Sequence, residues 1–363
     1  MSTTRIVFVT RLSAIGDVIM TSRALQLLFA NGYFPILVTS ESTKEIAQFV
    51  PQLTSVITIE KNQPPKYFNK SLQTLESNVF AQHLASVKAE KAPIFLDLQK
   101  TSRSKRARKI LSKSYYFEKT YTVPKRTLWR IFLIFLSYLF FSQRKKSKKL
   151  DVQKIENIKN IHEDIIIKIV KQDGKLFNST YSHEFLPLVQ TVKLNTPPYL
   201  CIFPGASSFI KMWPKENYQS LIKLILEKTN LNIVLLGGQE EVWLGEFFDF
   251  PKNTRVQNAI CQTNLTETLN YIAHSKYVVT NDSFPVHAAE AFRIPATVFF
   301  GSTSPQFGFA PKAQSISIEY ANLACSPCTR HGKRECRFRN LKCLTSLTAE
   351  DVIKNIMQKT QHS

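Results

Sequence analysis

The chain has 363 residues and a formal net charge of +21, with 44% hydrophobic and 21% charged residues. This length is sufficient for two α/β domains of ordinary size, and the composition excludes a disordered chain. The first residues lead directly into an apolar strand pattern, without the charged segment and apolar core of a signal peptide, so we expect no secretion.

The first 21 residues predict a strand, a short loop and a helix. Ile6–Val9 is a run of β-branched and aromatic residues, which is typical of a strand buried on both faces of a parallel sheet. Gly16 and Asp17 then begin a helix whose apolar residues recur at helical spacing. Asp17 is therefore expected at the carboxyl edge of the first strand, where open α/β sheets bind their ligands.

Two interpretations of Asp17 remain open. Its carboxylate either caps the helix by accepting backbone N–H bonds, or takes a proton from an incoming hydroxyl group. The helix N-terminus favours the ionised form that such a base needs. The single glycine of this loop, Gly16, differs from the three glycines of a dinucleotide-binding fingerprint, which argues against a dehydrogenase.

Strands and helices alternate through the rest of the first half, which predicts a parallel, doubly wound sheet. A domain boundary is expected near 191–198, where prolines gather without clear periodicity. The expected elements are strands at 36–39, 56–59 and 94–98 and helices at 40–49, 71–88 and 151–171.

The positive charge is concentrated in residues 100–150, which contain sixteen Lys or Arg and one acid, Glu118, for a net charge of +15. This excess predicts a polyanionic partner. Nucleic acid is not expected in this role, because the sequence lacks zinc-finger, RRM and KH signatures.

Residues 128–141 are apolar almost throughout, yet shorter than the roughly 20 residues of a transmembrane helix. They form either a core helix packed on the sheet or a surface element whose apolar residues enter one membrane leaflet. In the second case the basic residues beside them contact anionic headgroups, each contributing about 1 kcal/mol. These basic residues are Lys125, Arg126, Arg144, Lys145, Lys146, Lys148 and Lys149.

A second alternating pattern begins at residue 199 and predicts another α/β domain. Its first strand is followed by the small residues 204–208 and then by Lys211. Small residues let backbone amides approach an anion and the lysine supplies charge, so this loop is either a diphosphate cradle or a solvated loop with a surface lysine. The expected strands are 199–203, 232–236, 277–280 and 297–300, and the expected helices are 265–274, 286–292, 348–358 and one that begins at Pro214.

Two further loops of this domain follow strands. Residues 281–287 open a helix whose N-terminus favours a phosphate, with Asp282 available for sugar hydroxyls and His287 either facing phosphate or serving a structural role. Residues 237–241 offer a carboxylate, from Glu240 or Glu241, that accepts hydrogen bonds from both hydroxyls of a ribose.

Four of the six cysteines cluster near the end of the chain with the spacing C-x₂-C-x₇-C-x₆-C. A structural zinc site is the minor alternative for them in a reducing compartment, and the main expectation is no metal. They are Cys325, Cys328, Cys336 and Cys343.

In this order, the motifs resemble those of family 9 glycosyltransferases, the ADP-heptose:lipopolysaccharide heptosyltransferases. The resemblance covers nearly the whole chain. It is carried by RLSAIGDVIMT, PGASSFIKMWPKENY, LLGGQEE, NDSFPVHAAEAF, VFFGSTSP and the cysteine segment CSPCTRHGKRECRFRNLKC.

This resemblance implies a GT-B fold, with two Rossmann-like domains facing across a cleft. Residues 1–190 would bind the acceptor, with a membrane-proximal region at 100–150. Residues 191–345 would bind the nucleotide sugar, and a helix in 346–363 would cross back to the first domain. The implied activity is inverting transfer of heptose from ADP-heptose to the lipopolysaccharide inner core, at the cytoplasmic face of the inner membrane and without a required cofactor.

The family's catalytic aspartate falls on Asp17 and its phosphate-binding lysine on Lys211. Its donor-binding motif D-[ST]-G-x-x-H falls on Asp282, Ser283 and His287. Ser207 matches a phosphate-contacting hydroxyl, and the ribose-binding glutamate falls on Glu241 or Glu240.

One residue departs from the family pattern, because Phe284 replaces the motif glycine and brings a Cβ and a ring where close backbone approach is expected. The alternatives are therefore a GT-B transferase with another nucleotide sugar or acceptor and, outside enzymes, a non-catalytic basic protein that binds lipid or nucleic acid.

Overall fold

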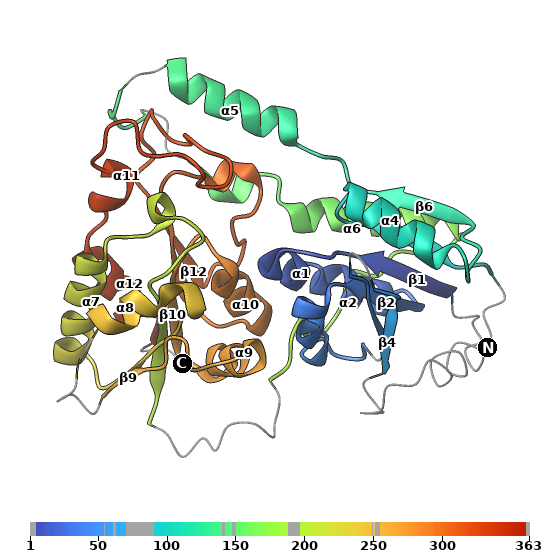
Figure 1. Cartoon of the computed structure of the whole chain (residues 1–363), viewed down its shortest axis with the longest axis horizontal. Helices are drawn as coiled ribbons and strands as arrows, with labels where there is room; N and C mark the ends of the chain where they lie inside the picture. The colour runs from blue at the N-terminus through green and yellow to red at the C-terminus, as the bar shows by residue number, and fades with distance from the viewer. Residues whose placement is uncertain are drawn as a thin grey trace. The chain divides into compact units, whose positions relative to one another are not determined.

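The computed structural model describes residues 5–53, 55–60, 63–69, 91–139, 142–146, 150–187, 197–248, 250 and 255–360 (Figure 1). The chain forms two compact units, Met1–Lys125 with Ile158–Leu188 and Arg126–Asn157 with Val189–Ser363. The sequence placed all of 100–150 in the first domain, whereas 126–157 groups with the second unit. The expected helix at 71–88 and most of the expected boundary at 191–198 lie outside the described residues.

The first unit contains a six-stranded sheet in the order β4-β3-β2-β1-β5-β6, parallel except for the antiparallel pair β3 and β4. The central strand β1 is buried along its whole length, as its β-branched sequence predicts. It lies between β2 and β5, at the switch point of the sheet where ligands bind. The strands are β1 (Arg5–Thr10), β2 (Tyr33–Thr39), β3 (Ser55–Thr58), β4 (Lys66–Asn69), β5 (Ile94–Asp97) and β6 (Lys119–Thr122).

The helices of this unit differ from the expected ones in three places. The helix expected at 151–171 begins at Ile158. The first predicted helix is broken at Thr21, whose hydroxyl donates to the Asp17 carbonyl and so competes with the helical pattern. The segment after β2 is a 3₁₀ helix instead of an α-helix. The elements are α1 (Ile15–Met20), α2 (Ser22–Ala30), the 3₁₀ helix η1 (Glu41–Gln48), α4 (Ser102–Leu111) and α6 (Ile158–Gln172).

A buried histidine of α6 makes the first unit sensitive to acid. His162 is 1% exposed, and neither of its ring nitrogens has a hydrogen-bond partner among the described residues. Burial lowers its pKa to about 3, and the positive charges of Arg11 and Lys159 act in the same direction. The unfolded chain, with a histidine pKa of about 6.5, therefore binds one more proton than the native protein between these two values.

We expect acidification from pH 7 to pH 5 to lower the free energy of unfolding by about 2 kcal/mol through His162, because stability rises with pH wherever the unfolded state binds more protons. Urea unfolding followed by circular dichroism at both pH values measures this loss. The His162→Leu variant should lack this contribution, whereas His183→Leu, at a half-buried histidine of the same unit, should keep it. An equal loss in His162→Leu and in the unmodified protein would contradict the assignment.

The second unit contains six parallel strands in the order β12-β11-β10-β7-β8-β9. Its switch point is β7, which pairs with β8 on one side and β10 on the other. The strands are β7 (Tyr199–Phe203), β8 (Asn232–Leu235), β9 (Val256–Asn258), β10 (Tyr277–Asn281), β11 (Ala296–Phe300) and β12 (Ile316–Tyr320).

Helices cover both faces of this sheet, with α7, α8 and α12 on one side and α9 and α10 on the other (Figure 1). The last helix packs on α7 and β11, with Val352, Ile353 and Ile356 in the core of the second unit. That it crosses back to the first domain stays a prediction. The helices are α7 (Lys215–Lys228), α8 (Val242–Phe247), α9 (Leu265–His274), α10 (Phe284–Phe292), α11 (Lys342–Thr345) and α12 (Ala349–Thr360), with 3₁₀ turns η2 (Val152–Lys154), η3 (Phe209–Lys211), η4 (Gln239–Glu241) and η5 (Pro305–Phe307).

The apolar segment after residue 127 forms α5 (Thr127–Leu139), which belongs to the second unit. Its buried residues are Leu133 and Ser137, whereas most of its large apolar side chains are exposed. The interpretation as a core helix is therefore wrong. Across the described ranges, no helix has the length and apolar character needed to span a bilayer.

Candidate active site

Asp17 lies in the first turn of α1, just after β1 ends. Its Oδ2 accepts a hydrogen bond from the Ala14 N–H at 3.2 Å and pairs with the guanidinium of Arg11. The side chain is 24% exposed, so solvent still reaches the carboxylate. The capping interpretation is thus confirmed in part, and the remaining exposure is what the second interpretation, a base that meets an incoming hydroxyl, requires.

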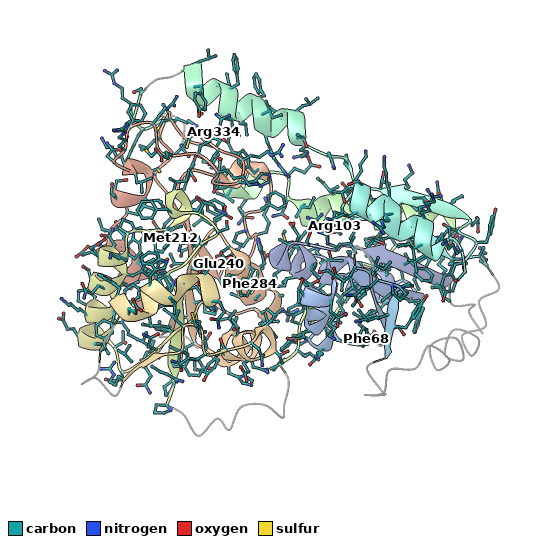
Figure 2. All side chains as sticks on the ribbon, in the orientation of Figure 1. Phe68, Arg103, Met212, Glu240, Phe284 and Arg334 are labelled. Carbon is teal, nitrogen blue, oxygen red and sulfur yellow. The ribbon has the colours of Figure 1, made fainter. Side chains whose placement is uncertain are left out.

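Arg11 fixes this carboxylate and was not singled out from the sequence. Its second Nη donates to the Leu98 carbonyl at 2.5 Å, which ties the end of β1 to the end of β5. The neighbouring Ser13 hydroxyl accepts from Arg103 of α4 at 3.3 Å (Arg103 is labelled in Figure 2). The carboxyl edge of this sheet therefore holds the Asp17 carboxylate with two arginines nearby.

In the second unit, Lys211 and Asp282 form an ion pair of 3.0 Å between Nζ and Oδ2. Lys211 ends η3 after the β7 loop, and Asp282 follows β10, which is the neighbouring strand. Thr303, after β11, donates to the same Asp282 oxygen at 2.7 Å. Three adjacent strands thus bring the predicted lysine and aspartate together at one sheet edge, and both side chains are largely buried.

Asn281 fixes the loop after β7 through side-chain hydrogen bonds. The residue is fully buried, and its Nδ2 donates to the carbonyls of Pro204 and Gly205, each at 2.9 Å. Its Oδ1 accepts from the Trp213 N–H at 2.8 Å. These bonds fix the β7 loop on both sides of Lys211. Sequence reasoning placed Asn281 in the turn without giving it this role.

A glycine of the cysteine segment, Gly332, contacts the same loop. Its carbonyl accepts a hydrogen bond from the Ser208 hydroxyl. A Cβ at Gly332 would lie 2.7 Å from the Ser208 Cβ and 3.2 Å from the Lys211 Cδ, and the residue has a φ of +80°. Both the close approach and the positive φ therefore require glycine here.

Beside this contact a pocket of about 990 Å³ opens at the surface of the second unit. The exposed Ser207 and its neighbour Ser208 form one wall, and residues 331–335 form another. The volume is in the range of ligand-binding clefts. Ser207 is thus at a cavity rather than in the core.

Glu241 lies against the β7 loop, at the end of η4. Its Oε2 accepts from the Gly238 N–H at 2.8 Å, and a Cβ at Gly205 would lie 1.7 Å from its Oε1. Burial raises the pKa of the Glu241 carboxyl, the charge of Glu240 adds to this, and the Gly238 N–H opposes it. Of the two glutamates, Glu240 is exposed (Figure 2), so the structure brings Glu241 to this edge.

The helix α10 begins directly after Asp282, with Ser283 at its N-cap. The Ser283 hydroxyl donates to the Asn281 carbonyl at 3.4 Å, so it does not cap the helix. Phe284 is the first helical residue, and its ring packs edge-on against Phe203 with centroids 6.1 Å apart (Figure 2). His287 is buried, 6% exposed, one turn further on.

The remaining candidates divide into basic residues and cysteines. Arg144 and Lys145 are exposed, the Lys146 Nζ donates to the Ser326 carbonyl at 2.7 Å, and Lys148 and Lys149 lie outside the described residues. The four clustered cysteines are free thiols that line one cavity of about 20 Å³. Within the described ranges, no group of three or more His, Cys, Asp or Glu has a metal-binding arrangement.

The comparisons with known proteins show which family the chain resembles. Residues 169–339, which contain Lys211, Asp282 and Glu241, match the sequence model described as "Glycosyltransferase family 9 (heptosyltransferase)". The resemblance to family 9 is confirmed. A curated relative, lipooligosaccharide heptosyltransferase 2 of Campylobacter jejuni, is 26% identical over 165 residues, which are 45% of this chain and 51% of the relative. The chain thus spans about half the length of this relative.

Solved heptosyltransferase structures match nearly the whole length of the chain. The E. coli ADP-heptose lipopolysaccharide heptosyltransferase II has a TM-score of 0.64 at 15% identity, with 99% of both chains covered. An E. coli heptosyltransferase with ADP-2-deoxy-2-fluoro heptose has a TM-score of 0.62 at 17% identity, covering 97% of this chain and 99% of its own. The predicted fold class, GT-B with two Rossmann-like parallel-sheet units, is therefore confirmed.

Proposed function

We propose that this chain transfers a heptose from ADP-heptose to the inner core of lipopolysaccharide, with inversion at the anomeric carbon. The observation that carries the proposal is the ion pair of Lys211 with Asp282 at the carboxyl edge of β7 and β10, within the stretch that matches family 9. Curated relatives are lipooligosaccharide heptosyltransferases, and a solved neighbour contains an ADP-heptose analogue.

In this reaction the first unit supplies the general base. Asp17 removes the proton from an acceptor hydroxyl, whose oxygen then forms a bond to the anomeric carbon of the donor. The bond from that carbon to the diphosphate breaks as the new bond forms, and its electron pair leaves with ADP. Arg11 holds the Asp17 carboxylate in place before the acceptor arrives.

The second unit stabilises the leaving diphosphate. Lys211 supplies a positive charge, Ser207 a hydroxyl donor at the pocket wall, and the N-terminus of α10 at Ser283 the partial positive charge of a helix end. Glu241 accepts hydrogen bonds from the ribose hydroxyls. Asp282 contacts sugar hydroxyls once the phosphate draws Lys211 away from it. With these groups in place, transfer is expected to need no divalent cation.

The acceptor in this proposal is an anionic, lipid-linked glycan at the cytoplasmic face of the inner membrane. The support is the net charge of +15 in residues 100–150, which suits a negatively charged surface. The E. coli relative is named a lipopolysaccharide heptosyltransferase, and lipopolysaccharide is an anionic, lipid-linked glycan.

Phe284 sustains a second candidate, a transferase for another nucleotide sugar. Its ring occupies space between α10 and the end of β7 that a motif glycine would leave open. The helical backbone there causes no strain, because Phe284 starts α10 with ordinary helical geometry. The ring thus changes the shape of the site but leaves the N-terminus of α10 in place. The preference for the donor nucleotide sugar must therefore be measured.

Calorimetric titration of the purified protein with ADP-heptose, ADP-glucose, UDP-glucose and GDP-mannose tests the proposal. We expect ADP-heptose to bind at least tenfold more tightly than the UDP- and GDP-sugars, with ADP-glucose in between. A preference for UDP or GDP would favour the second candidate. Absence of binding by every nucleotide sugar would favour a non-catalytic protein.

A further inference from the structure

The helix α5 presents an apolar face that is exposed in the part of its unit that the structure describes. Its exposed residues Leu128, Phe132, Phe135 and Leu139 are spaced by four, three and four positions, so they share one face of the helix. They are 82%, 48%, 56% and 61% exposed. The buried Leu133 and Ser137 lie on the opposite face. Three more large side chains, Trp129 (47%), Ile131 (49%) and Tyr138 (41%), flank the exposed face.

The arginine-rich loop 330–339 holds the inner face of this helix. Arg337 donates to the Ser137 carbonyl and lies over the Tyr138 ring, 4.6 Å from its centroid. Arg334 donates to the Tyr138 hydroxyl at 2.9 Å. At the other end, Arg130 lies 4.4 Å from the centroid of Phe309. Figure 1 shows α5 as a rod above this loop, which leads to α11, and Arg334 is labelled in Figure 2.

Positive charge surrounds the exposed apolar face. The loop 330–339 contains five Lys or Arg and a single acid, Glu335. Residues 142–146, which follow the helix, add the exposed Arg144 and Lys145 without any acid. The helix itself contains no Asp, Glu or Lys. An apolar strip between cationic flanks complements a surface that is apolar below an anionic layer, which is the interface of an anionic bilayer.

The groove between α5 and the loop 330–339 also combines an apolar wall with a cationic wall. Its volume is about 300 Å³. Ile131 and Ile134 form an apolar wall, and Arg330, Lys333 and Arg334 form a cationic one. A lipid phosphate and the start of its acyl chain require these two environments side by side.

From these observations we infer that α5 and the loop 330–339 form one membrane-docking surface, on which the second unit binds an anionic lipid bilayer with α5 lying in the interface plane. The inference deepens the proposed function, on which it rests for the presence of a membrane-bound acceptor. It places the docking surface on the unit that holds the Lys211–Asp282 pair, and not on the acceptor domain where the sequence put it. A helix of 13 residues is about 20 Å long, so it lies along the interface and does not cross it.

Sedimentation of the full chain with vesicles of phosphatidylglycerol and phosphatidylcholine, compared with phosphatidylcholine alone, tests the inference. We expect binding to the anionic vesicles that falls at least tenfold in Phe132→Ser/Phe135→Ser and in Lys333→Gln/Arg339→Gln. Two control variants should bind as the unmodified protein does: Leu176→Ser, at a 97% exposed apolar residue of the first unit, and Lys354→Gln on α12.

Tryptophan fluorescence gives a second measurement that does not depend on sedimentation. In a Trp243→Phe background the remaining tryptophans are Trp129, on the exposed side of α5, and Trp213, which is buried. Brominated lipids in the anionic vesicles should therefore quench Trp129 and leave Trp213 unquenched. Equal binding to neutral and anionic vesicles, or no quenching, would overturn the inference.

A second copy of the chain is the other occupant that an apolar face can have. The docking inference would be wrong if the unmodified protein bound no vesicles and formed a dimer by light scattering that the Phe132→Ser/Phe135→Ser variant did not form. Calorimetric titration with ADP-heptose separates these outcomes from the proposed function, since the α5 variants should keep the donor affinity of the unmodified protein. Vesicle binding without any donor binding would contradict the proposed function and support the docking surface.

Discussion

Replacing Asp17 with Asn is expected to lower kcat at least 100-fold, because a positioned general base contributes roughly 10²- to 10⁴-fold. The asparagine side chain is nearly isosteric, and its carbonyl oxygen still accepts the hydrogen bond from the Ala14 N–H. The start of α1 should therefore persist. Turnover with purified ADP-heptose and acceptor measures the loss, and the thermal unfolding temperature checks that the fold is kept.

The matched control is Asp164→Asn, which removes an exposed carboxylate of α6 in the same unit. We expect it to retain full activity. Near-normal turnover by Asp17→Asn would leave Asp17 with its capping role alone. A large loss of stability in that variant, with activity restored at low temperature, would lead to the same conclusion.

The second large effect is expected from Lys211→Met. This change removes the cation that contacts the diphosphate, and a hydrogen bond to a charged group contributes about 1.5–3 kcal/mol. Donor affinity should therefore fall by about 10- to 100-fold, and kcat should fall as well because the same charge stabilises the leaving group. Calorimetry for the donor and initial rates at saturating donor separate the two effects.

Lys211→Met also leaves Asp282 without its cation in a largely buried place, which costs stability. The double variant Lys211→Met/Asp282→Asn removes both charges and should recover stability without recovering donor affinity. Lys223→Met, at an exposed lysine of α7, serves as the control for loss of a positive charge. If Lys211→Met and Lys223→Met bound the donor equally well, Lys211 would have only its structural ion pair with Asp282.

The sequence predicted which residues lie at the sheet edge of each unit, because their placement depends on a local sequence pattern. A buried strand followed by small or polar residues places those residues at the carboxyl edge of a sheet, and this was sufficient for Asp17, Lys211 and Asp282. That these last two form an ion pair followed from the parallel pairing of β7 with β10, two strands separated by more than 70 residues. The pairing itself has no local signature in the sequence.

The supporting residues were missed for the same reason. Asn281 bonds to carbonyls 76 and 77 residues earlier, and Arg11 to a carbonyl 87 residues later, so neither bond is visible in a local window. For α5 the difficulty was different, because both of its faces are apolar and periodicity gave no buried side. The break of the first helix at Thr21 depends on one hydroxyl contact, which helix periodicity does not encode.

The attachment of α5 has a consequence for the newly made chain. The bond between Arg337 and the Ser137 carbonyl joins residues 200 positions apart. At synthesis rates of about 5–20 residues per second, the helix leaves the ribosome about 10–40 s before its supporting loop exists. During that interval both apolar faces of α5 are exposed to water. The nascent chain therefore carries an aggregation-prone segment, which a chaperone or the bilayer must cover until translation ends.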